Sequence, residues 1–170
     1  SGISDIDRMI SAHLLDSLSL WNLLSGDNIL DVGSGGGLPG IPLSILDPKK
    51  SFTLLDSNGK KTRFLFQVKL ELGLENIEIV NERVENYKSS KQFDTIVCRA
   101  FSSIANVIDL TSNILKEECS LLIMKGVYPS EEIKRLPEGY RVNAIHAVNV
   151  PYLQSDRHVI EVLKEPGMPL

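Results

Sequence analysis

The residues with the most specific chemistry form a glycine-rich segment, LDVGSGGGLPGIP, at residues 30–42. It holds five glycines and two prolines in thirteen residues, directly after a short apolar run, and neither a regular helix nor a regular strand tolerates that mixture. Such a loop brings backbone N–H groups close to a ligand. Three glycines fit the dinucleotide-binding spacing G-x-G-x-x-G: Gly35, Gly37 and Gly40. A second spacing, D-x-G-x-G-x-G, is formed by Asp31, Gly33, Gly35 and Gly37.

The charge of Asp31 separates these two interpretations. A dinucleotide places a doubly charged pyrophosphate on the loop, and a carboxylate beside it repels that ligand. S-Adenosylmethionine, which is typical of the second spacing, carries an ammonium and a sulfonium that Asp31 attracts, directly or through water. Unit charges about 4 Å apart interact by roughly 4 kcal/mol at an effective dielectric constant of about 20, so the sign of this interaction favours the methyl donor. A dinucleotide site and a glycine-rich turn without a ligand are the alternatives.

Further positions fit the same donor. Asp56 ends the strand expected beside the glycine loop, where a carboxylate binds the two ribose hydroxyls. Residues 82–87 follow the third strand, and backbone groups of Val84 and Glu85 are placed there to bind the adenine edge. Arg99 directly follows the fourth strand, where an arginine without a partner is costly, so we expect it at the mouth of the cleft.

The sequence shows no residue pattern typical of amine methylation, of a cysteine nucleophile or of a metal site. No Asn/Asp-Pro-Pro-aromatic stretch, typical of enzymes that methylate exocyclic amines, follows the fourth strand. Cys98 lies in an apolar strand and is expected in the core, and the three histidines have neither metal-ligand spacing nor an acid–base partner, so we expect no metal. Guanine N7 has a lone pair and no proton, so its methylation needs positioning and no general base. Arg99 and Lys125 are the candidates for that positioning, by holding the donor carboxylate, an RNA phosphate or guanine O6.

Strands and helices alternate around these residues. Short apolar runs predict strands at 28–32, 51–56, 77–80, 93–98, 120–124, 140–150 and 158–164. Helical spacing predicts helices at 5–24, 41–46, 58–72, 103–115 and 129–136. The alternation predicts a parallel sheet with right-handed crossovers, and the short loop between the last two strands predicts an antiparallel hairpin at one edge. We therefore expect a Rossmann-like α/β fold with a seven-stranded, mostly parallel sheet and an antiparallel C-terminal hairpin.

Length and composition indicate one domain, residues 1–170. The chain has 42% hydrophobic and 24% charged residues and a net charge of −4. Its apolar runs are far shorter than a membrane span, we find no signal peptide, and Cys98 and Cys119 stand alone. We expect a cytoplasmic monomer that does not bind a membrane.

Positive charge is concentrated between Lys49 and Lys69, where six basic residues accompany one acid. The concentration is either a solvated helix face or a phosphate-binding patch on an otherwise acidic protein. The second interpretation makes Lys60, Lys61 and Arg63 candidates for RNA binding.

Seven motifs, in order along nearly the whole chain, match one family. They are HLLDSL (13–18), DVGSGGGLPGIPLSI (31–45), LLDSNGKKTRFL (54–65), RVE (83–85), FDTIVCRAFSS (93–103), LLIMKG (121–126) and RH (157–158). In these motifs the sequence closely resembles the bacterial small-subunit rRNA guanine-N7 methyltransferases (RsmG, also called GidB). The LPGIP continuation and CRAFSS distinguish this family from other methyltransferases.

The resemblance implies a class I S-adenosylmethionine-dependent methyltransferase that methylates N7 of one guanine in 16S rRNA of the small ribosomal subunit. Carried over by position, it implies a donor site of Gly33, Leu38, Asp56, Ser57, Asn58, Val84, Glu85 and Arg99. Lys125 and Arg157, in the last two motifs, join the candidates for RNA binding. Family members carry an extra helical segment ahead of HLLDSL, and we expect this chain to lack it. The alternatives are methylation of another RNA site, a small molecule or a protein, and a non-enzymatic nucleotide-binding domain.

Overall fold

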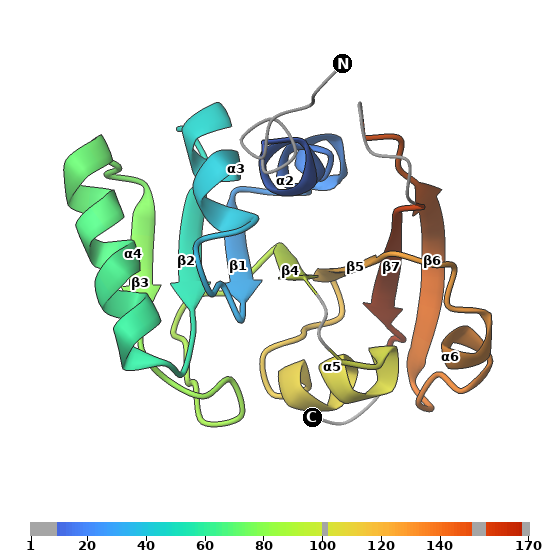
Figure 1. Ribbon diagram of the computed structural model, residues 1–170. Coiled ribbons are helices and arrows are strands. Elements are labelled where there is room, and N and C mark those ends of the chain that lie inside the picture. Colours follow the sequence, from blue (N-terminus) through green and yellow to red (C-terminus); the bar gives the residue numbers. More distant parts are fainter. Residues whose placement is uncertain (1–9, 100–101, 151–155, 168–170) are drawn as a thin grey trace, which may run out of the picture.

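Seven strands form a single sheet in the computed structural model, which describes residues 10–99, 102–150 and 156–167 (Figure 1). The strands are β1 Asn28–Val32, β2 Ser51–Leu55, β3 Ile77–Val80, β4 Thr95–Arg99, β5 Ser120–Lys125, β6 Tyr140–Ala147 and β7 His158–Lys164. Their order is β3-β2-β1-β4-β5-β7-β6, with the first five parallel and β7 antiparallel to both of its neighbours. The predicted fold class is confirmed. The hairpin is also confirmed, with β6 at the edge, because β7 returns between β5 and β6.

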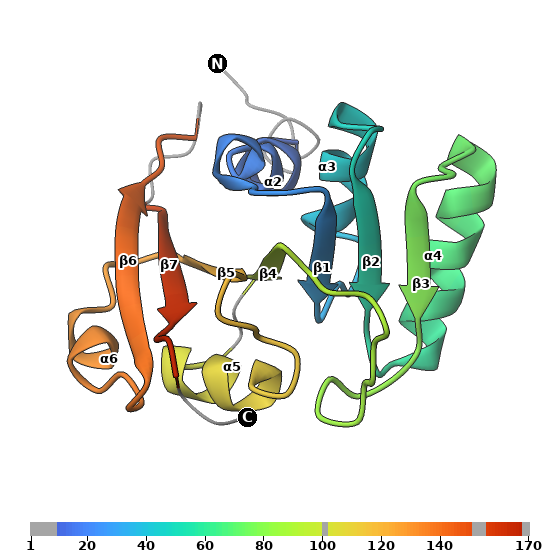
Figure 2. The same ribbon diagram turned by 180° about the vertical axis from the view of Figure 1, so that it is seen from behind.

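Helices cover both faces of the sheet. They are η1 Ile10–Leu15, α2 Asp16–Leu18, η2 Trp21–Leu23, α3 Gly40–Leu46, α4 Gly59–Leu72, α5 Ile104–Thr111 and α6 Ser130–Lys134. The opposite views of Figures 1 and 2 show α3 and α4 on one face of β1–β3. One apolar core lies on that face and contains side chains such as Leu43 and Leu65. A second core lies on the other face, where Ile104 and Ile108 of α5 pack against β4 and β5.

The residues that cap α4 at its two ends explain where the helix begins and ends. The Asn58 side chain accepts hydrogen bonds from the N–H groups of Lys60 and Lys61, which have no partner inside the helix. Gly73 ends the helix in the left-handed conformation at φ 63°. Helix α4 therefore starts directly after the carboxyl end of β2, next to the glycine-rich loop.

The predicted N-terminal helix is partly wrong. Residues 5–9 of the prediction lie outside the described residues. Residues 10–18 are helical without a break, π-type at Ile10–Leu15 and α-type at Asp16–Leu18, and a separate 3-10 helix follows at Trp21–Leu23. The hydroxyls of Ser17 and Ser19 donate to the carbonyl oxygens of His13 and Asp16, and these bonds compete with a regular backbone ladder. In this stretch Asp16 is buried and only 3% exposed.

Candidate active site

Parallel strands bring the candidate residues to one edge of the sheet. Val32, at the end of β1, aligns with Leu55 of β2 and with Cys98 of β4. The residues that follow these three strands therefore meet at the same edge, where ligands bind in open α/β sheets. The glycine-rich loop, Asp56 and Arg99 lie there.

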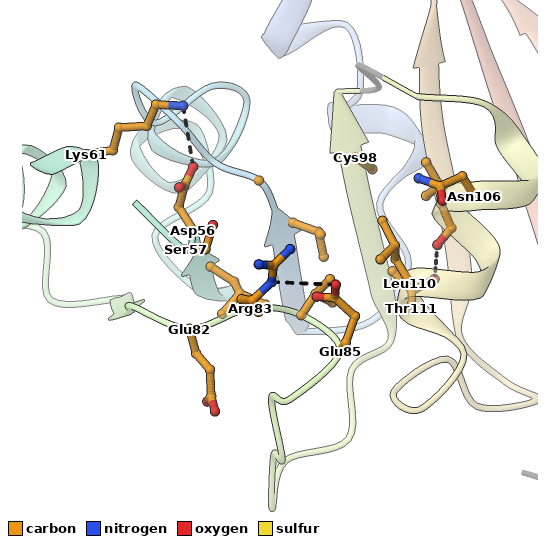
Figure 3. Close-up of a pocket in the computed structure, with 15 residues that line it drawn as sticks. Asp56, Ser57, Lys61, Glu82, Arg83, Glu85, Cys98, Asn106, Leu110 and Thr111 are labelled. Atoms are coloured by element: carbon orange, nitrogen blue, oxygen red, sulfur yellow. Dashed lines mark hydrogen bonds and ion pairs between the residues drawn. The ribbon is translucent and has the colours of Figure 1, made fainter. Parts of the chain in front are cut away.

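A cavity of about 540 Å³ opens at this edge (Figure 3). Its lining residues are Val32, Gly33, Leu55, Asp56, Ser57, Lys61, Glu82, Arg83, Val84, Glu85, Cys98, Asn106, Val107, Leu110 and Thr111. In Figure 3 Asp56, Ser57 and Lys61 line one side, and Asn106, Leu110 and Thr111 of α5 line the other. The volume is in the range of pockets that hold a small-molecule cofactor, about 300–1,000 Å³.

The glycine-rich loop is fastened to the end of β2. The N–H groups of Gly33 and Ser34 donate to the carbonyl oxygen of Leu55, at 2.8 and 3.1 Å. The N–H of Gly35 donates to Oδ2 of Asp56 at 2.8 Å. Gly37 has a φ of 90°, and a Cβ there would lie 2.5 Å from Cδ1 of Ile41, so no larger residue fits without movement. The loop needs its glycines for this path as well as for access to a ligand.

Asp31 lies beneath the loop. Its side chain is fully buried, Oδ2 accepts from the N–H of Gly40 at 2.9 Å, and Oδ1 has no hydrogen-bond partner among the described residues. Burial raises the pKa of this carboxyl to about 7, in spite of the bond from Gly40. Asp31 therefore lies beneath the loop and is not among the described residues that line the cavity.

Asp56 and its neighbours form the polar side of the cavity. Oδ2 of Asp56 accepts from Gly35, and Oδ1 accepts from the N–H of Asn58 at 2.8 Å. Each carboxylate oxygen keeps a second lone pair for a ligand hydroxyl. Lys61 Nζ lies 4.0 Å from Oδ2 of Asp56, and the Lys61 side chain is 54% exposed. Lys61, predicted from its charge to bind RNA, thus lines the cavity expected to hold the donor, while Lys60 and Arg63 are exposed on α4.

The loop after β3 closes the cavity from below. Val84 and Glu85 line it, as the adenine prediction requires, together with Glu82 and Arg83. The Asn113 side chain donates to the carbonyl oxygens of Val84, Glu85 and Tyr87 and holds this loop in place.

Arg99 lies on the other side of β4 from Cys98, because side chains alternate along a strand. Its Nη2 is 3.2 Å from Nδ1 of His13 and 3.9 Å from Oδ2 of Asp16. Arg157 joins the same group through an ion pair of 3.3 Å between its Nε and Oδ1 of Asp16. Arg99 therefore has the partners that an arginine at a strand end needs.

Lys125 does not fit its predicted role. Its Nζ donates to the carbonyl oxygen of Ser102 at 2.7 Å and to Oε1 and Oε2 of Glu132 at 3.1 and 2.9 Å. The Lys125 side chain is 13% exposed, and three protein acceptors surround its three protons. Glu132 also accepts from the N–H of Ile104, so this lysine fastens the start of α5 to α6.

The potential bases and nucleophiles among the described lining residues are carboxylates, a lysine and the Cys98 thiol, and none of these residues is a histidine. Burial raises the pKa of the Cys98 thiol to about 12, so it remains protonated and does not attack a ligand. Within the described ranges no three metal-ligating side chains gather, and no helix is long and apolar enough to cross a membrane.

The sequence interpretation missed one wall of the cavity and the contact between the N-terminal turn and Arg99. Asn106, Val107, Leu110 and Thr111 line the cavity, but in the sequence they belong to an ordinary amphipathic pattern. His13 and Asp16 belong to HLLDSL, a motif that carries the family resemblance and by itself indicates no role for either residue. Their spacing held no signal, because their partner, Arg99, is more than eighty residues away.

Solved structures show the same fold in methyltransferases. A SAM-dependent methyltransferase from Aquifex aeolicus superposes with a TM-score of 0.70 at 20% identity, covering 92% of this chain and 93% of that chain. The glycopeptide N-methyltransferase MtfA, complexed with S-adenosylhomocysteine, superposes with a TM-score of 0.75 at 11% identity, covering 89% and 87%. Together with the strand order, these superpositions define a Rossmann-like α/β fold of the kind that these methyltransferases share.

Sequence relatives narrow the class to one family. The family of rRNA small subunit methyltransferase G, GidB, matches residues 1–160, and the chain belongs to it. Ribosomal RNA small subunit methyltransferase G of Pseudomonas aeruginosa strain LESB58 is 55% identical over 161 residues, which are 94% of this chain and 75% of the relative. The Marinomonas protein of the same name is 49% identical over 165 residues, 97% of this chain and 79% of the relative. The resemblance stated from the motifs is confirmed.

Proposed function

We propose that this chain transfers the methyl group of S-adenosylmethionine to N7 of a specific guanine in 16S rRNA of the small ribosomal subunit. The observation that carries the proposal is a donor-sized cavity at the carboxyl ends of the parallel strands, with the Asp56 carboxylate at the ribose position. The names of the relatives, rRNA small subunit methyltransferase G, support rRNA as the substrate.

The cavity residues fit the donor. We assign Asp56 to the ribose hydroxyls, because its two oxygens are held in place by Gly35 and Asn58. The apolar walls formed by Leu55, Val84 and Leu110 suit the faces of an adenine ring. The carbonyl oxygens of Val84 and Glu85 accept from Asn113, so we expect the adenine edge to use the N–H groups of this loop.

The amino-acid part of the donor belongs at the glycine-rich loop. We assign Gly33, Gly35, Gly37 and Leu38 to it, and Arg99 to its carboxylate. Asp31 lies below this loop, close enough to Arg99 and Asp56 for each charge to affect the Asp31 pKa. A cationic donor offsets the cost of ionising Asp31, whereas a pyrophosphate increases that cost.

The reaction needs no proton transfer. When bound, S-adenosylmethionine supplies an electrophilic methyl group on a sulfonium. The guanine N7 lone pair forms the new N–C bond as the S–C bond breaks, and the positive charge moves from sulfur to the guanine ring. The protein has to hold the two atoms in line and to exclude water. Its cavity, with a protonated Cys98 and no described histidine in its lining, is suited to that task.

RNA reaches the site over the basic start of α4. Lys60 and Arg63 are exposed there, and Lys61 lies between them at the cavity. These charges follow the carboxyl end of β2, so a phosphate backbone bound to them passes the mouth of the cavity. We place the protein in the cytoplasm as a monomer.

Transfer of labelled methyl groups tests the substrate. The protein is incubated with tritiated donor and with small ribosomal subunits that lack the modification, and in parallel with the naked 16S rRNA. We expect label on 16S rRNA as N7-methylguanine. Label only on protein, on a small molecule or at another RNA atom would overturn the proposal. The donor itself is tested by adding S-adenosylhomocysteine, which raises the unfolding temperature if it binds the folded state.

A further inference from the structure

Asp16 is a buried carboxylate that joins two arginines from distant parts of the chain. It belongs to α2, and its side chain is 4% exposed. Oδ2 lies 3.9 Å from Nη2 of Arg99, at the end of β4, and Oδ1 lies 3.3 Å from Nε of Arg157, just before β7. One carboxylate therefore links the carboxyl end of the central sheet to the start of its last strand.

His13 adds a second restraint to Arg99. Its Nδ1 lies 3.2 Å from Nη2 of Arg99. A guanidinium only donates hydrogen bonds, so in this arrangement Nδ1 of His13 accepts and its ring proton is on Nε2. Nη2 of Arg99 thus has a hydrogen-bond partner in His13 and an ion-pair partner in Asp16, both from the same N-terminal segment.

The two arginines are more accessible than the carboxylate between them. The Arg99 and Arg157 side chains are 33% and 25% exposed, whereas the Asp16 side chain is 4% exposed. A negative ligand that approaches this group therefore meets the guanidinium groups before it meets Asp16.

Arginine side chains have many rotamers, and ordering them on binding costs affinity. A carboxylate that holds them beforehand removes part of that cost and fixes where their N–H groups point. We propose that Asp16, assisted by His13, is a positioning residue that holds Arg99 for the carboxylate of the methyl donor and Arg157 for a phosphate of the RNA. This inference rests on the proposed function, because it assumes those two ligands.

A double-mutant cycle on donor affinity tests the link to Arg99. The dissociation constant of S-adenosylhomocysteine is measured by calorimetry for the wild type, Asp16→Asn, Arg99→Gln and the double variant. We expect Asp16→Asn to weaken binding about five- to tenfold and the double variant to bind no more weakly than Arg99→Gln alone. If the two single effects multiply in the double variant, or if Asp16→Asn binds like the wild type, the positioning role is wrong.

Two further variants keep this test independent of folding. Removing one partner of a buried ion pair destabilises a protein, so the unfolding temperature of each variant is measured as well. His13 is exposed, and His13→Ala is expected to weaken donor binding severalfold without unfolding the chain, again with no added effect when Arg99 is already Gln. Asp16→Glu keeps the charge and is expected to bind the donor more tightly than Asp16→Asn. Wild-type affinity in His13→Ala together with equal affinities in the two Asp16 variants would overturn the proposal.

Asp94 supplies the matched control. Its Oδ2 accepts from the N–H groups of Asp27 and Asn28, both at 2.8 Å, just before β4 and at the opposite edge of the sheet from Arg99. Asp94→Asn is expected to lower the unfolding temperature and to leave donor affinity unchanged.

Methylation kinetics test the link between Asp16 and Arg157. Asp16→Asn is expected to raise the KM for RNA, with no further rise when Arg157→Gln is added. If the wild type binds the donor and labels 16S rRNA but these cycles are additive, only the role of Asp16 fails. If the wild type does neither, the proposed function fails.

Discussion

The Asp56 carboxylate accepts a hydrogen bond of 2.8 Å from the backbone N–H of Gly35. This bond ties the end of β2 to the middle of the glycine-rich loop, so the residue assigned to the ribose also sets the path of the loop. A change at Asp56 therefore affects the donor at two points.

Replacing Asp56 by Ala is expected to weaken binding of S-adenosylhomocysteine by at least tenfold, which corresponds to about 1.4 kcal/mol. Asp56→Asn keeps an acceptor for Gly35 but lacks the charge, and it is expected to retain part of the affinity. Calorimetric titration measures both. Asp27→Asn is the control, because Asp27 is exposed at the other end of β1. Equal affinities for the wild type and Asp56→Ala would remove Asp56 from the site.

Gly40→Ala is expected to destabilise the fold by about 1–3 kcal/mol, the usual cost of an overpacked side chain. A Cβ at this position would lie 2.7 Å from Oδ2 of Asp31 and even closer to Cδ2 of Leu54. Denaturant unfolding without a ligand measures the change. Gly36→Ala is the matched control, since a Cβ there has nothing within 4 Å. A Gly40→Ala variant as stable as Gly36→Ala would mean that the contact between the loop and Asp31 is looser than described.

The raised pKa of Asp31 predicts a pH-dependent stability. Burial raises this pKa from 3.8 to about 7, so between these values the folded protein keeps a proton that the unfolded chain releases. The stability contributed by this proton is complete below a pH of about 4 and is lost as the pH rises to about 7. Denaturant unfolding across this range is expected to show a decline in the free energy of unfolding that is smaller in Asp31→Asn. Parallel curves for the two proteins would contradict the assignment.

The basic start of α4 predicts the salt dependence of RNA binding. Lys60→Glu with Arg63→Glu is expected to weaken RNA binding and to reduce the slope of log K against log salt by roughly 0.7 for each lost phosphate contact. Donor affinity is expected to remain unchanged, because neither residue lines the cavity as described. Filter binding at several salt concentrations measures the slope. Lys91→Glu with Lys116→Glu changes the net charge equally at the amino edge of the sheet, and it is expected to leave the slope nearly unchanged.

Local pattern was enough to predict the sheet and the position of the loop. The strands at 28–32 and 77–80 have the predicted bounds, because a short apolar run between turn residues is typical of a buried strand. The helix expected over 103–115 ends at Thr111, whose hydroxyl donates to the Val107 carbonyl and so competes with the ladder. Such competition depends on side-chain geometry, which periodicity does not contain.

The candidate site was predictable where a residue directly follows a strand, as Asp56 does. It was not predictable where a distant partner decides the role. Lys125 is the last residue of β5, and its place at a strand end predicts contact with a ligand, but its ammonium donates to Glu132 and Ser102. The charge of Lys61 predicts RNA binding, and the structure adds that its Nζ lies 4.0 Å from Oδ2 of Asp56 at the cavity. Only the three-dimensional arrangement distinguishes these outcomes.

The position of β7 between β5 and β6 has a consequence for synthesis of the protein. Until residues 158–164 leave the ribosome, β5 has an open edge and β6 has no neighbour to pair with. Arg157 reaches Asp16 only when this strand is inserted, so the pair of arginines on Asp16 is completed by a segment that is translated after the other six strands. A nascent chain that already holds the glycine loop and the Asp56 carboxylate therefore still has an unpaired strand edge, which is where other chains associate. Insertion of β7 closes that edge and completes the arginine pair in the same event.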